Sequence, residues 1–260
     1  VYTFVIRRES VPALTRQEWL YIALIGIGNF TIGQVGINLA LEHLPAITNN
    51  YLMNFIGFVT MALSIFIMRE TPYLFQIIGA GIAIAGLRVY FRSVPTPDEL
   101  TGILLMGMAI LAIAFTNNAA RKLSQISSSL SNNILSTLAL LIGGSLTVVV
   151  GLVTQWPLQI GSWGNLGFAV YNGVVGMAIG LTAWNYVLRT LRSYEASILG
   201  ATGIIWTALL AIPILGERPL LHQVIGMILM LIGIALVQVR IGRLGTLFSK
   251  KQAVPNRTGQ

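Results

Sequence analysis

The strongest constraint on the fold of this chain is an internal repeat. Residues 26–86 align with residues 173–233 without a gap at a constant offset of 147, and 18 of the 61 aligned pairs are identical. Identical Leu or Ile pairs arise easily by chance in an apolar chain, whereas identical polar and turn-forming residues at one offset do not. Identical pairs of this second kind are Gly26/Gly173, Gly33/Gly180, Asn38/Asn185, Thr60/Thr207, Glu70/Glu217, Pro72/Pro219, Gln76/Gln223, Gly79/Gly226 and Gly86/Gly233. The chain is an internal duplication, which in a membrane protein indicates transport.

Composition places the duplicated chain in a membrane. Hydrophobic residues make up 55%, charged residues only 9%, and the mean hydropathy is +0.78, whereas a soluble domain carries about 25% charged residues. Apolar runs of about 20 residues predict helices that span a bilayer. Eight such runs are 19–41, 46–68, 72–91, 100–119, 132–154, 164–188, 196–215 and 220–239. The predicted fold is therefore an all-α membrane protein, a polytopic helical bundle.

The basic residues predict how this bundle is oriented. If the first connection is cytoplasmic, 13 Lys or Arg side chains lie on that side and only three, Arg88, Arg92 and Arg218, on the other. Because positive residues are retained in the cytoplasm, the C-terminus is expected to be cytoplasmic. The net charge of +8 then reflects basic ends near anionic lipid, and nucleic acid is not an expected partner.

Orientation and offset together predict that the two repeats are inverted. The basic segment 7–16 aligns with 154–163, which contains no Lys or Arg, and Arg189 aligns with Glu42. Corresponding loops therefore lie on opposite sides of the membrane, as expected when each repeat has an odd number of spans.

The offset also predicts that the first repeat is incomplete. Val1 aligns with Val148, inside the predicted helix 132–154, and the second repeat has a further helix, 100–119, before that point. We expect eight full transmembrane helices plus a stub at Val1–Ile6, from a parent of two inverted five-helix repeats. The predicted domains are a truncated first repeat at 1–92, a second repeat at 93–240, and a basic cytoplasmic tail at 241–260.

Two matching stretches carry a resemblance to a known family. Met68-Arg69-Glu70-Thr71-Pro72 followed by Gln76-Ile77-Ile78-Gly79 and Gly86 parallels Leu215-Gly216-Glu217-Arg218-Pro219 followed by Gln223-Val224-Ile225-Gly226 and Gly233. Each half resembles an EamA domain of the drug/metabolite transporter superfamily. The resemblance implies ten helices in the intact protein, a central cavity between the halves, and export or exchange of small organic solutes.

The chain departs from this pattern at one point. Many relatives have a Pro about thirteen residues before the acid, where this chain has Gly57 and Ile204, the latter beside Gly203. The helix bend implied there would then come from Gly.

Uncharged polar residues inside the spans are the candidate substrate-binding groups. Amides within a bilayer need partners, so these faces are expected to point into the bundle. The candidates are Gln34, Asn38, Asn50, Asn54, Thr182, Trp184, Asn185 and Trp206, and Thr31, Phe58 and Thr202 lie on the same faces. One interpretation is a cavity whose amides bind a polar solute between aromatic walls. The alternative for any single residue is a hydrogen bond between neighbouring helices.

The other recurrent residues have mainly structural interpretations. Glu70 and Glu217 sit in tight turns, each followed two residues later by Pro. We expect each acid to stabilise the start of the helix that follows it, rather than to act as a gate or coupling acid. The repeated glycines are expected to allow close helix packing, and Asn117 with Asn118 an ordinary helix-end cap.

The spans lack the groups that other chemistries require. No Asp, Glu, Lys or His lies near the middle of a predicted helix, so facilitated diffusion or solute exchange is favoured over proton coupling. The absence of Cys and the two well-separated histidines, His43 and His222, argue against a metal site, and no cofactor is expected.

Three functions compete on this basis. The first is a secondary transporter of a small organic metabolite, amino-acid-like or amphiphilic, that works by alternating access in export or exchange. The second is a non-transporting membrane scaffold or receptor, and the third is an intramembrane enzyme, which would need clustered reactive groups that the sequence lacks. The transporter is favoured, with the bacterial inner (plasma) membrane as its location. Its expected partners are a small-molecule substrate and membrane lipid, with a homodimer left open.

Overall fold

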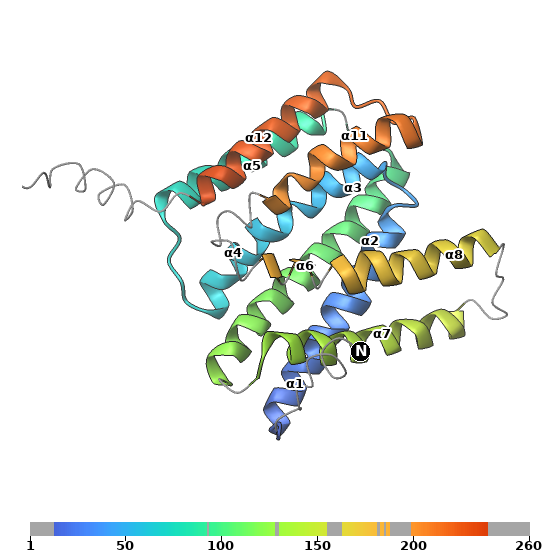
Figure 1. Cartoon of the computed structure of the whole chain (residues 1–260). Helices are drawn as coiled ribbons and strands as arrows, with labels where there is room; N and C mark the ends of the chain where they lie inside the picture. Colours follow the sequence, from blue (N-terminus) through green and yellow to red (C-terminus); the bar gives the residue numbers. More distant parts are fainter. Residues whose placement is uncertain are drawn as a thin grey trace, which may run out of the picture.

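A helical bundle forms the whole of the chain that the structure, a computed structural model, describes (Figure 1). The described residues are 13–92, 94–127, 130–154, 163–180, 183–184, 186–187 and 199–238, and they contain no strand. Four helical segments, 16–40, 46–67, 97–126 and 132–153, are long and apolar enough to cross a membrane. Three shorter apolar helices cover 74–90, 199–215 and 221–237. The prediction of an all-α membrane bundle is confirmed.

The first predicted span is one continuous helix whose middle segment is π-helical. It comprises α1 (Arg16–Ile25), the π-helical segment η2 (Gly26–Gly33) and α2 (Gln34–Ala40). The second repeat contains α8 (Trp163–Tyr171) followed by the π-helical segment η3 (Asn172–Ile179). Position 26 aligns with position 173, so the two π-helical segments occupy the same place in the repeat to within one residue. The duplication thus extends to a rare backbone geometry.

The second predicted span is broken in two. α3 (Ala46–Met53) ends and α4 (Phe55–Ile67) begins on either side of Asn54, whose side-chain Nδ2 donates to the carbonyl of Asn50 at 2.9 Å. In the second repeat α11 (Gly203–Leu215) follows a similar break at Thr202, whose hydroxyl donates to the Leu199 carbonyl at 2.6 Å. Side chains that bond to carbonyls of the preceding turn bend helices. The interruption of the helix pattern thus lies at Asn54 and Thr202, and the expectation that Gly bends these helices stays a prediction.

The last helices of the two repeats pack directly against one another. α5 (Leu74–Tyr90) and α12 (Leu221–Val237) run antiparallel along one edge of the bundle (Figure 1). A Cβ atom placed on Gly79 would lie 2.5 Å from the Gly233 carbonyl oxygen, and one on Gly86 would lie 3.0 Å from that of Gly226. Small residues let these backbones touch. The crossed pairing of equivalent glycines is the contact expected of inverted repeats.

The remaining helices surround the long helix α6 (Pro97–Ile126), which contacts α1, η2, α2, α3 and α4. It extends seven residues beyond the predicted end at 119. α7 (Asn132–Thr154) packs against η2 and α1, and Gly26 meets Gly143 at this crossing. The Thr31 hydroxyl donates to the Gly143 carbonyl at 2.9 Å, which fixes the π-helical segment on α7. α6 thereby joins the two repeats along their length.

Candidate functional site between the repeats

A hydrogen bond between predicted site residues and the opposite repeat lies at the α3–α11 contact. The Asn50 amide Nδ2, on α3, donates to the Thr207 hydroxyl oxygen, on α11, at 2.9 Å. Both side chains are half-buried. One helical turn along, Asn54 is also half-buried and bonds back to the Asn50 carbonyl. The structure therefore brings Asn50 and Asn54 together on the face of α3 that meets the second repeat.

A related contact involves the repeat partner of Thr207. Thr60, on α4, accepts a hydrogen bond from Asn117 Nδ2 at 3.4 Å, and its backbone carbonyl accepts one from Asn118 Nδ2 at 3.0 Å. Asn118 is completely buried. The expectation that Asn117 and Asn118 cap a helix end was wrong, because α6 continues to Ile126 and both amides bind α4 instead.

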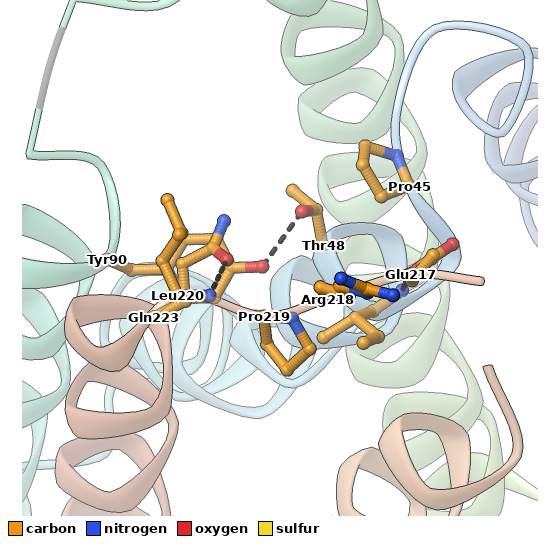
Figure 2. A pocket seen from close by; sticks show the side chains of 9 residues that line it. Pro45, Thr48, Tyr90, Glu217, Arg218, Pro219, Leu220 and Gln223 are labelled. Atoms are coloured by element: carbon orange, nitrogen blue, oxygen red, sulfur yellow. Dashed lines mark hydrogen bonds between the residues drawn. The ribbon is translucent and has the colours of Figure 1, made fainter. Parts of the chain in front are cut away.

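A cavity opens beside α3, toward the end of the bundle where α11 turns into α12. Its volume is about 230 Å³. The Thr48 and Tyr90 hydroxyl oxygens lie 2.8 Å apart at its wall (Figure 2), and the Tyr51 ring stacks on the Tyr90 ring with centroids 4.1 Å apart. The lining residues are Pro45, Ile47, Thr48, Tyr90, Glu217, Arg218, Pro219, Leu220 and Gln223. Both repeats contribute to this cavity, which offers hydroxyl and amide groups among apolar side chains.

Glu217 joins this cavity to the start of α3. Its two carboxylate oxygens accept the backbone N–H groups of Ala46 and Ile47, at 2.6 and 3.0 Å. The expectation that each recurrent acid stabilises the start of its own following helix was wrong. Gln76 and Gln223 do that, because their side-chain oxygens accept the N–H groups of Tyr73 and Leu220 at 3.0 and 2.8 Å.

Glu70 has a different partner at the opposite end of the bundle. Arg121, on α6, donates to both of its carboxylate oxygens, at 2.6 and 3.2 Å. These hydrogen bonds and the positive charge of Arg121 hold the pKa of Glu70 below its ordinary value, although partial desolvation opposes the shift. Equivalent acids in the two repeats thus make unlike contacts.

Comparison with known families decides the broad class of this site. Residues 1–92 and 100–239 match the EamA-like transporter family. The chain belongs to this family. Among curated proteins, none matches the sequence. The family and the apolar spanning helices together make the chain an integral membrane protein and a transporter of the drug/metabolite type.

Other predicted site residues of this EamA-like transporter lie away from the Asn50–Thr207 bond or outside the described residues. Gln34 is half-buried and Asn38 exposed, and neither amide has a hydrogen-bond partner in the described part of the chain. Trp184 is exposed, and Trp206 is 62% exposed. Thr182 and Asn185 lie outside the described residues. Their assignment to a common cavity stays a prediction.

Sequence reasoning missed the aromatic and hydroxyl groups of the transporter's cavity. Thr48 and Tyr51 are three residues apart on α3 and so share a helix face, which was a usable signal. No sequence pattern singled out Tyr90, because it is the last residue of a mostly apolar helix. In the described ranges, no group of three or more His, Asp or Glu side chains could hold a metal ion.

Proposed function

We propose that this EamA-like transporter is a secondary carrier that moves a small organic metabolite, amino-acid-like or amphiphilic, by alternating access. The observation that carries the proposal is the Asn50–Thr207 hydrogen bond at 2.9 Å, which crosses between the repeats from α3, the helix that also supplies Ile47 and Thr48 to the cavity. A solute with donor and acceptor groups can replace such a bond when the repeats separate. Polar groups placed among apolar walls are typical of sites for small organic ligands.

Export or exchange without proton coupling is the proposed mode. Among the described residues, Glu18 is the only buried charged side chain, and it sits in the first turn of α1 rather than at mid-membrane depth. A titrating relay would require an ionisable group inside the bundle. The energy for net movement then comes from the gradient of the solute or of its exchange partner.

The proposed location is the bacterial inner membrane with a cytoplasmic C-terminus. His43 contacts Asp98 at the same end of the bundle as Glu217, whereas Glu70 and Arg121 meet at the other end. The excess of basic residues near Glu70 and Arg121 supports placing that end in the cytoplasm. The cavity beside Glu217 would then face the periplasm.

Counterflow in proteoliposomes tests the proposed function. Solute-loaded vesicles that contain the full chain would be screened against a metabolite panel, and the active solute would be retested with Asn50→Ala, Asn54→Ala and Asn185→Ala. We expect each substitution to reduce transport while leaving expression and folding intact. Asn132→Ala is the matched control, since this amide is exposed at the start of α7. Unchanged transport in the three site variants would remove the polar cavity from the mechanism.

A further inference from the structure

The helix α3 begins without a cap of its own. The residue before it is Pro45, whose side chain makes no capping hydrogen bond. The first N–H groups of a helix have no partner within the helix and must be satisfied from outside. The two carboxylate oxygens of Glu217, which is 171 residues away from Ala46 in sequence, accept the N–H groups of Ala46 and Ile47. The start of α3 therefore depends on a residue from the other repeat.

The structure of α3 allows this half-helix to move as a unit. It covers only Ala46–Met53 and is separated from α4 by the break at Asn54. Apart from Glu217, its polar contacts with other described helices are the bonds of Thr48 to Tyr90 and of Asn50 to Thr207. Both are single hydrogen bonds between uncharged groups, whereas Glu217 makes two bonds from an ionised group, which are the stronger kind.

Glu70 shows that the turn around each acid does not dictate this contact. Arg69 and Gly216, which precede the acids, are both left-handed, with φ of 55° and 69°. The N–H groups of Glu70 and Glu217 bond back to repeat-equivalent carbonyls, those of Ser64 and Ala211. Despite the same backbone, Glu70 binds a guanidinium and Glu217 binds a helix start. The two equivalent acids therefore make different contacts in the described part of the chain.

We propose that Glu217 is a latch that closes one end of the transport path. With its carboxylate on the Ala46 and Ile47 amides, α3 is tied to the turn between α11 and α12 beside the cavity (Figure 2). When the carboxylate leaves, α3 swings about Asn54, water takes the two amides, and the cavity extends deeper between α3 and α11. Glu70, at the opposite end of the bundle, binds Arg121. The inference rests on the proposed alternating-access function.

A cysteine-accessibility experiment tests the latch directly. The chain has no Cys, so Ile47→Cys introduces a single thiol at a position that is 3% exposed next to the latch. Labelling by a membrane-impermeant maleimide would be followed in proteoliposomes of the full chain, with and without Glu217→Gln or Glu217→Ala. We expect roughly tenfold faster labelling without the carboxylate, the population change expected when a charged hydrogen bond is lost.

Two controls separate opening of the latch from unfolding. Glu42→Gln removes the same charge from the exposed loop just before α3 and should leave labelling of Ile47→Cys unchanged. Ala139→Cys, at a fully buried site in α7, should stay protected in the Glu217 variants. Equal labelling of Ile47→Cys with and without Glu217 would overturn the latch.

A second measurement keeps the test decisive if the Glu217 variants do not fold. With Glu217 intact, Ile47→Cys and Arg218→Cys, which line the same cavity, would be joined by a reducible bifunctional thiol reagent. We expect transport to stop on crosslinking and to return on reduction. Continued transport by the crosslinked protein would overturn the latch and leave the transporter intact. Failure of the proposed function would instead show as the absence of counterflow by the unmodified chain for every solute in the panel.

Discussion

Gly79 and Gly233 face one another across α5 and α12, and each excludes a side chain from the other. A Cβ on Gly79 would lie 2.5 Å from the Gly233 carbonyl oxygen, and a Cβ on Gly233 would lie 2.6 Å from the Gly79 carbonyl oxygen. Real Cβ atoms do not approach backbone oxygens so closely. The repeat relates this contact to the one between Gly226 and Gly86, since positions 79 and 226 are equivalent, as are 86 and 233. This helix pair therefore has no room for a side chain at these glycine positions.

Gly79→Ala should destabilise the bundle. The new methyl group must push α5 away from α12, and overpacking of this kind costs about 1–3 kcal/mol. Thermal unfolding in detergent measures the effect. The control is Gly81→Ala on the same helix, where an added Cβ would meet nothing within 4 Å. Equal melting temperatures for the two variants would contradict the close packing.

Arg69 and Gly216 both have a left-handed backbone, and substitutions at the two positions should change stability in opposite directions. Gly216 has a φ of 69°, so Gly216→Ala places a Cβ atom in the left-handed region. This substitution should lower the free energy of unfolding by about 1 kcal/mol. Arg69, with φ of 55°, already bears that cost, so Arg69→Gly should be neutral or slightly stabilising. Gly57→Ala serves as the control, because this residue lies inside α4 with open space around it. Chemical denaturation of all three variants checks the signs.

Asn50 and Thr207 should be energetically coupled. Asn50→Ala and Thr207→Val each remove one partner of the hydrogen bond between α3 and α11. The double variant should therefore be less impaired than the sum of the single variants, with a coupling free energy of about 0.5–1.5 kcal/mol. The cycle is measured by unfolding and, separately, by counterflow. Strict additivity in both would show that the pair does not interact.

The ion pair of Glu70 and Arg121 predicts a pH-dependent contribution to stability. The pKa of Glu70 is held below 4.5, first by hydrogen bonds from Arg121. A carboxylate with a depressed folded-state pKa stabilises the fold above its unfolded value, and that stabilisation is lost as pH falls through the folded value. The melting temperature of Arg121→Gln should thus fall below that of the wild type at pH 5–7, and the difference should vanish at lower pH.

The size of this effect should be small, because both side chains are about half exposed. Exposed ion pairs contribute about 0.2–1 kcal/mol. Lys122→Gln is the matched control, since this neighbouring cation is exposed and makes no ion pair in the described part of the chain. A gap between wild type and Arg121→Gln that persists below pH 3 would contradict the assignment.

Local chemistry explains which features of the site could be predicted. Asn50 and Asn54 were identifiable because amides are costly in lipid, and both lie where α3 meets the rest of the bundle. The break at Asn54 was not identifiable, because Gly57 is the residue that propensity marks as weak. At Asn54 the side chain makes a hydrogen bond to the previous turn, which composition does not reveal.

The sequence by itself determined the helices, the duplication and the family. The helices follow from the hydropathy of neighbouring residues, and the duplication follows from identities at one constant offset. Only the tertiary structure decided the partners of the polar side chains. Glu70 and Glu217 occupy equivalent positions of the repeat, each two residues before a Pro, yet one binds Arg121 and the other binds the start of α3. The physical reason is that a buried or half-buried polar group must be satisfied by whatever the packing of distant helices brings within reach.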